Sequence, residues 1–442
     1  MKIEQIKVAI SLLISGILFF VVVPLPLKFP GTGLDPSWQF AMTWAQSHGY
    51  TFGRDIVFTF GPYNSLYTCL YTPSSDFFTL ISGGWLYLCC LFLFVSLYNG
   101  RNWKSILASL LVFCAFGRER DVLFFSYIFL YLLTIHRFTC RETTKPDLIR
   151  LAIVTSGCAL IMLIKGSYTL AILPICALSF SYCLYKKRKD LAIVMGMTLF
   201  FAIPILWILA GQSLLALPDW FHILIPIISG YSDAMSVIGP KKDFALYLIP
   251  ALTIILFVFL SELQLIDKIF LFCGLSFLFF IVFKVGFTRH DDIHVLWAFQ
   301  FILIVLISIG ILQINIINKF SYIFFVITFL CIFYIYPNSE ILHHIQNSIY
   351  SGISGITSRI NGKADIAYEE HIQKLKQKTQ LPELEGTSDI YAWDLTDLLV
   401  SGNTWNPRPI PQSYSVYTPE LCRMNTVSLE RERERENKRL PG

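Results

Sequence analysis

The chain has 442 residues, of which 55% are hydrophobic and only 15% are charged. An ordinary soluble domain has roughly 25% charged residues, so this composition excludes a soluble globular protein, a disordered chain and a collagen-like or disulfide-bonded scaffold. The mean hydropathy of +0.60 indicates that most of the chain lies in lipid. The net charge of +5 predicts no nucleic-acid partner, because the basic residues are spread over many short loops and form no patch with interleaved aromatic side chains.

Residues 8–27 are the first apolar run. They follow Lys2 and Lys7 and precede no small-residue cleavage site, which predicts an uncleaved signal anchor with the N-terminus inside. The sequence predicts an all-α polytopic membrane protein with about eleven transmembrane helices, N-in and C-out, in the bacterial inner membrane. The later apolar runs cover residues 77–99, 105–116, 122–135, 148–164, 168–185, 191–210, 244–260, 269–284, 293–312 and 320–336.

Two of these runs, 105–116 and 122–135, are short for full spans. We expect either a tight pair of spans that meets the surface at 118–121 or a re-entrant hairpin. The positions of Lys and Arg agree with the orientation, since short cytoplasmic loops carry the positive charges. The loops placed inside contain Arg101, Lys104, Arg137, Arg141, Lys145, Arg150 and the basic run 186–189.

The organisation predicted is a transmembrane domain over 1–336 and an extracytoplasmic C-terminal region over 337–442. The transmembrane domain carries two external loops, 28–76 and 211–243, and the second loop contains an apolar interfacial segment. Helical stretches around 339–379 and a strand with turns over 389–420 predict a small α/β C-terminal region. Its last part alternates Glu and Arg, which is typical of a frayed helix or a disordered end.

The first external loop contains the clearest local pattern. Asp35, Pro36 and Gly49 occupy the positions expected for the N-cap, the first helical residue and the C′ residue of a helix of about fourteen residues. This helix has a single apolar stripe, which consists of Trp38, Ala41, Met42 and Ala45. The stripe predicts a helix that lies flat on the membrane. Capping is a complete structural explanation for Asp35; the functional alternative is a carboxylate that accepts a proton or holds a divalent cation.

A long first external loop with an Asp directly before a juxtamembrane helix, on an eleven-span scaffold, resembles the GT-C superfamily of integral-membrane glycosyltransferases. The similarity covers architecture rather than extended sequence. It implies that Asp35 is a catalytic base or metal ligand. It also implies a sugar donor carried on polyprenyl phosphate and a cell-envelope glycan or lipid as acceptor.

Basic residues elsewhere outside the membrane are candidates for phosphate binding. Arg54 and Asp55 form either a surface ion pair or a phosphate site. The cluster 118–121, with Arg118 and Arg120, is either a self-solvated turn or a seat for an anionic lipid or pyrophosphate. Lys165 either extends to the interface or joins such a site.

The densest group of ionisable residues lies in the loop 284–294, between two spans. Arg289, His290, Asp291 and His294 offer phosphate binding, acid–base chemistry or metal ligation, although they match no zinc signature. A solvated turn is the alternative. We favour function, because ionisable residues this close to a bilayer are costly unless they are used or hydrated.

In the C-terminal region, Trp405 and Arg408 lie on a proline-rich loop. Such a loop suits carbohydrate stacking, but it also serves as a rigid connector. None of the cysteines forms a CxxC pair or a Cys/His spacing that predicts a metal or redox site.

Three functions remain: a glycosyltransferase, an O-antigen type polymerase or ligase of surface polysaccharide, and a transporter of envelope precursors. A transporter places polar groups near the bilayer midplane, whereas the candidate residues here gather at the outer ends of the spans. A polymerase commonly has two Arg-rich external loops, and the middle loop offers only Lys241 and Lys242. The sequence therefore favours an enzyme in which Asp35 activates the acceptor. Arg289, with Arg54 or Arg118, would hold the leaving polyprenyl phosphate, and His290 or Asp291 would assist.

Overall fold

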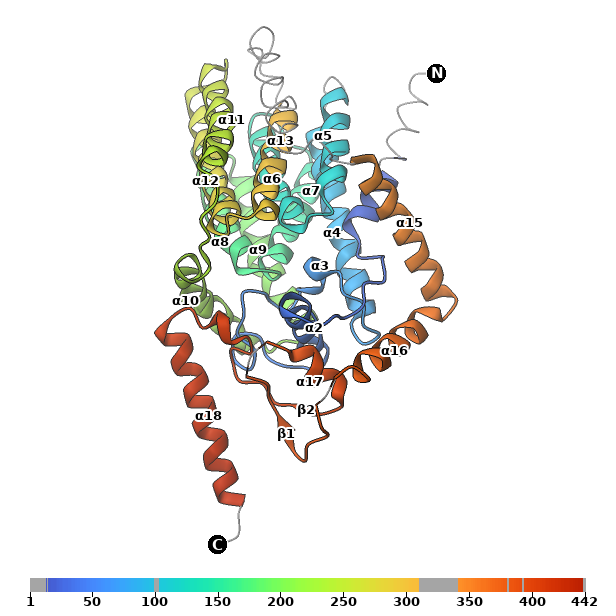
Figure 1. Cartoon of the computed structure of the whole chain (residues 1–442). Coiled ribbons are helices and arrows are strands. Elements are labelled where there is room, and N and C mark those ends of the chain that lie inside the picture. Colours follow the sequence, from blue (N-terminus) through green and yellow to red (C-terminus); the bar gives the residue numbers. More distant parts are fainter. Residues whose placement is uncertain are drawn as a thin grey trace.

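The computed structural model describes residues 13, 15–98, 103–309, 341–379, 381–391 and 393–439, with backbone only for 341–344 and 434–439 (Figure 1). Its helices are α2 (Leu34–Ser47), α3 (Ser65–Thr68), α4 (Asp76–Leu97), α5 (Trp103–Phe116), α6 (Arg120–Thr139), α7 (Lys145–Met162), α8 (Gly166–Tyr185), α9 (Lys189–Leu209), η1 (Leu214–Ala216), α10 (Leu217–Met235), α11 (Lys241–Leu260), α12 (Leu265–Thr288), α13 (Asp292–Ser308), α15 (Ile341–Ile360), α16 (Lys363–Lys376), α17 (Leu395–Ser401), η4 (Ser413–Ser415) and α18 (Pro419–Arg439). Residues 15–22 are also helical.

Within the described ranges, seven helical segments are long and apolar enough to cross a membrane: α4, α6, α8, α9, α11, α12 and the stretch Leu214–Met235. The expected all-α membrane protein is confirmed at this level. Helices α5 and α13 are apolar but shorter. Residues 8–12 and 14 of the first expected span and all of 320–336 lie outside the described residues, so the count of about eleven spans and the orientation remain predictions.

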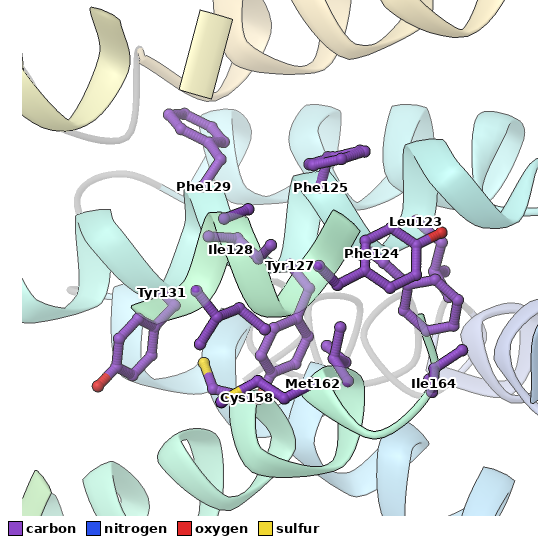
Figure 2. Packing of buried hydrophobic residues seen from close by; sticks show 14 of the residues in the cluster. Leu123, Phe124, Phe125, Tyr127, Ile128, Phe129, Tyr131, Cys158, Met162 and Ile164 are labelled. Carbon is purple, nitrogen blue, oxygen red and sulfur yellow. The ribbon is translucent and has the colours of Figure 1, made fainter. Parts of the chain in front are cut away.

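Helix α6 is the centre of the bundle. The apolar run 122–135 is short for a full span, but α6 extends beyond it to 20 residues, and nearly all of them are buried. Helices α4, α5, α7, α8, α12 and α13 all contact it. Figure 2 shows Tyr127 of this helix beside Cys158 and Met162 of α7, whereas Phe125 and Phe129 point to the opposite side, where both rings contact Phe301 of α13. The Tyr127 hydroxyl donates to the carbonyl of Val154 at 2.6 Å, and a Cβ on Gly157 would lie 2.1 Å from that hydroxyl oxygen. This contact requires glycine at position 157.

The first external loop covers one end of the bundle, which we call the loop end. Helix α2 lies here with its predicted stripe buried: Trp38, Ala41, Met42 and Ala45. The stripe packs into the main hydrophobic core, and Phe40 on another face packs against Leu375 and Val400 of the C-terminal region. Asp35 is not the N-cap. The helix starts at Leu34, two residues before the expected Pro36, and the N-cap is Gly33.

The segment 211–243 forms η1 and α10 rather than an irregular loop. Leu214–Met235 is long enough to span a membrane, but both of its ends lie at the loop end. Near its start, Asp219 pairs with Arg54 of the first loop. Just beyond its end, the backbone N–H of Val237 donates to the carbonyl of Thr288 at 2.8 Å, at the C-terminus of α12. The helix therefore runs across the loop end (Figure 1), and its placement at the membrane interface remains a prediction.

The described C-terminal region is mainly helical, and its strands are only two residues long. Strands β1 (Thr387–Ser388) and β2 (Thr404–Trp405) pair in parallel, so the expected α/β region is reduced to this short contact. Helix α15 packs along α5, and Arg359 pairs with Asp76 of α4 at 2.7 Å. The Glu/Arg repeat, expected to fray or to be disordered, forms the second half of α18. Opposite charges three residues apart support a helix there.

Candidate functional site

Asp121 and Lys165 form a buried ion pair at the loop end. The Lys165 Nζ lies 2.9 Å from one carboxylate oxygen of Asp121 and 3.2 Å from the other. The hydroxyls of Tyr67 and Tyr168 donate to the same carboxylate at 2.6 and 2.7 Å. The aromatic rings of Phe60, Tyr67 and Tyr168 surround the ammonium. Lys165 therefore does not extend to the interface. It ties the first loop to the starts of α6 and α8.

Arg120, next to this pair, links the first external loop to the first apolar segment. Its Nε and Nη2 contact the sulfur of Cys69 at 3.1 and 2.8 Å, and its Nη1 donates to the carbonyl of Val22 at 3.0 Å. Lys28 lies close enough for the charges of Arg120 and Asp35 to act on its ammonium. The guanidinium of Arg120 is thus largely committed to protein contacts.

The loop between α12 and α13 is linked to the same region. The Asp291 carboxylate caps α13 by accepting from the backbone N–H of His294 at 3.0 Å, and it lies 2.7 Å from the His294 Nδ1. Burial alone would raise the pKa of Asp291, but these hydrogen bonds and the charges of His294 and Arg289 lower it. The ring of Trp297 lies beside His294, and its indole N–H donates to Glu119 at 3.0 Å. A continuous chain of contacts therefore joins the loop 289–294 to the turn before α6.

Arg289 makes no short ion pair with the described residues. Its contact with the Asp291 carboxylate is 3.7 Å long, and its side chain is 36% exposed. Its charge acts on the hydroxyls of Tyr414 and Tyr417, two residues of the C-terminal region. Burial raises the pKa of Tyr417, and the hydrogen bond to Ser415 and the charge of Arg289 partly offset that rise. A guanidinium with free donors is suited to bind phosphate oxygens.

The charge of Asp35, in the first loop, acts on the same tyrosine, Tyr414. Its carboxylate accepts from the indole N–H of Trp38 at 3.1 Å, and the residue is exposed. Burial raises the pKa of Tyr414, and the charge of Asp35 adds to that rise while Arg289 opposes it. The charges of Asp35 and Arg289, which come from segments more than two hundred residues apart in the sequence, therefore both act on the Tyr414 hydroxyl. Asp35, Arg289, Asp291 and His294 belong to one region of the loop end.

Other predicted residues are occupied elsewhere. His290 is buried, with its Nε2 3.1 Å from the Asp243 carboxylate at the start of α11. Trp405 is buried, and its indole N–H donates to Asp389 at 3.0 Å. Arg408 is also buried and pairs with Asp389 at 2.6 Å. These two side chains hold the proline-rich loop to the rest of the C-terminal region, so neither offers a sugar-stacking surface.

Arg54 and Asp55 do not pair with each other. Arg54 binds Asp219 and the carbonyl of Leu215, and Asp55 accepts from the backbone N–H of Thr51 at 2.9 Å. Arg118 is exposed in the turn before α6. An open cavity of about 540 Å³ lies between the first loop and α18, and its lining includes Tyr50, Arg54, Asp55, Asn406, Glu420 and Arg423.

The sequence did not single out several residues of this region. Asp121 stood in a recognised charge cluster but was not named as a site residue, and the tyrosines at 67, 168 and 417 carried no local signal. Tyr414 belongs to the proline-rich loop of Trp405 and Arg408 but was not named as a site residue. Their partners lie in distant segments. Among the described residues, no three potential metal ligands gather around Asp35, so the donor set does not fit a divalent cation there and we derive no step through one.

Comparison of the chain with protein-family models, curated proteins and solved structures finds no match in any of the three.

Proposed function

We propose that this protein transfers a sugar from polyprenyl phosphate to a glycan or lipid acceptor at the loop end, which we assign to the extracytoplasmic side. One observation carries the proposal. Asp35 and Arg289 act on the same tyrosine, Tyr414, and neither is committed to a short ion pair. A base for the acceptor and a cation for a phosphate leaving group are thus available in one place.

In the proposed step, the acceptor hydroxyl oxygen bonds to the anomeric carbon of the donor sugar. The bond from that carbon to the phosphate oxygen breaks, and its electron pair leaves with the polyprenyl phosphate. Asp35 accepts the proton of the attacking hydroxyl. Arg289 stabilises the negative charge that develops on the phosphate.

The other residues of the loop end position these two groups. Asp291 holds the start of α13 through His294 and keeps a weak contact with Arg289. The Asp121 and Lys165 pair fixes the starts of α6 and α8. Both features make the phosphate-binding side rigid, which helps a site that depends on preorganised charge.

The distribution of charge supports an interfacial enzyme over a transporter. In α4, α6, α8, α9, α11 and α12, every Asp, Glu, Lys and Arg lies within about five residues of a helix end, which leaves the interior of these spans free of ionised groups. A transporter site near the midplane requires the opposite arrangement.

The test uses full-length protein in proteoliposomes that contain a polyprenyl-phosphate sugar fraction and envelope glycolipid acceptors, with products followed by mass spectrometry. Asp35→Asn should reduce transfer by about 10²–10⁴-fold, and Arg289→Gln by about 10²–10³-fold. Asp233→Asn, which changes an exposed carboxylate on α10, is the matched control and should keep wild-type transfer. Wild-type rates in the Asp35→Asn protein, with normal membrane insertion, would reject the assignment.

A further inference from the structure

A second cluster of ionisable residues lies at the opposite end of the bundle, where Arg137, Arg141, Lys186 and Arg188 gather; we call this the basic end. His136 is in the last turn of α6, and Cys140 caps that helix. The two are four residues apart and therefore share one helix face. Asp267 comes from the first turn of α12 and reaches the same point.

The three side chains offer one ligand atom each, and these atoms all lie within 4.8 Å of one another. The Cys140 sulfur is 3.6 Å from the His136 Nε2 and 3.7 Å from one carboxylate oxygen of Asp267. Ligand atoms around a tetrahedral zinc ion are separated by about 3.3–3.6 Å, given metal–ligand bonds of about 2.0–2.3 Å. The two separations from the Cys140 sulfur are close to this spacing, and the third lies within 4.8 Å.

The contacts behind Asp267 match those that support a metal-binding carboxylate. One of its oxygens accepts from the Tyr182 hydroxyl at 2.8 Å and lies 2.7 Å from the Lys186 Nζ. The other oxygen faces Cys140. A carboxylate that binds a metal through one oxygen is commonly held by hydrogen bonds to the other. The Lys186 ammonium also offsets part of the negative charge of the Cys140 thiolate and the Asp267 carboxylate.

The surroundings of the cluster also suit a ligand. His136 is buried, and its Nε2 is the ring nitrogen that faces the Cys140 sulfur. Cys140 is exposed and borders an open cavity of about 490 Å³ whose lining also includes Thr143, Arg188 and Asp190. The cavity provides an entry path and space for a fourth ligand such as water.

We propose that His136, Cys140 and Asp267 bind a divalent transition-metal ion of the zinc class at the basic end. Thiolate and imidazole ligands select such ions over magnesium or calcium. With three protein ligands and an open fourth position, the site resembles reactive zinc sites more than closed structural ones. It lies at the other end of the bundle from Asp35 and is independent of the proposed sugar transfer.

The test uses purified full-length protein that has been treated with a chelator under reducing conditions and titrated with Co²⁺, whose thiolate complexes absorb light by charge transfer. We expect one Co²⁺ per chain with this absorption, and its loss when Zn²⁺ is added. Cys140→Ser should abolish the absorption. Cys422→Ser, which changes an exposed cysteine of α18, is the control and should retain it.

A second measurement avoids any dependence on a variant that fails to fold. In the wild-type protein, Zn²⁺ should protect Cys140 from alkylation and leave the labelling of Cys422 unchanged, as read by peptide mass spectrometry. Absence of the cobalt absorption in the wild type, its retention in Cys140→Ser, or equal labelling of Cys140 with and without Zn²⁺ would each overturn the proposal.

Discussion

The ion pair of Asp121 and Lys165 is the contact whose loss should be most costly at the loop end. The Asp121 side chain is 1% exposed and that of Lys165 is 16% exposed. Asp121→Asn leaves a buried ammonium with aromatic rings but no anion. Removal of one partner of a buried pair costs about 3–5 kcal/mol, because the remaining charge stays desolvated.

Lys165→Met should fall at the lower end of that range, since Tyr67 and Tyr168 still donate to the Asp121 carboxylate. The double variant removes both charges and leaves none unpaired. Its loss of unfolding free energy should therefore be about 1–3 kcal/mol less than the sum of the two single losses.

The assay is unfolding of the purified protein in mixed micelles with rising sodium dodecyl sulfate, followed by tryptophan fluorescence. Arg118→Gln, at an exposed position in the neighbouring turn, is the control and should change stability by less than about 0.5 kcal/mol. If the two single losses add to the double loss within about 0.5 kcal/mol, the pair is not coupled and the argument fails.

Three further outcomes follow from other contacts. Gly157→Ala should destabilise the bundle, because its Cβ would lie 2.1 Å from the Tyr127 hydroxyl. Tyr127→Phe alone should also destabilise the protein, but in the double variant it should recover part of the loss caused by Gly157→Ala. The same micelle titration measures both effects. A Gly157→Ala protein as stable as wild type would contradict the predicted clash. Because the pKa of Asp291 is lowered in the folded protein, its ionised form contributes stability above about pH 4, and this contribution is lost as the pH falls further. The difference in melting temperature between wild type and Asp291→Asn should therefore shrink between pH 5 and about pH 3, and a constant difference would refute it. Tyr182→Phe removes a hydrogen bond to Asp267 and should weaken Co²⁺ binding at the basic end by about 10–100-fold, measured by titration; unchanged affinity would show that this bond does not support the ligand.

Much of the secondary structure follows from the sequence, because helices in lipid must satisfy every backbone polar group internally. Apolar length alone therefore locates α4, α8, α9, α11 and α12 within a few residues of the expected runs. The C′ position of α2 was also correct, since Gly49 has a φ of 77°, a conformation that glycine adopts without strain.

Helix partners did not follow from the sequence. A helix that is apolar on all sides has no periodicity that marks one face as its contact surface. The central position of α6 was therefore not visible, and neither was the pairing of Lys165 with Asp121. The buried roles of Trp405 and Arg408 depend on Asp389, whose position beside them is set by the fold of the loop.

The sequence by itself determined that this is a helical membrane protein whose ionisable residues gather near the ends of its apolar runs, because charge is excluded from the bilayer interior and polar backbone from lipid. Only the tertiary structure decided which of those residues meet. The charges of Asp35 and Arg289 both act on Tyr414, and Cys140 meets Asp267 across 127 residues of chain. Such contacts depend on helix packing over long sequence separations, which local pattern does not encode.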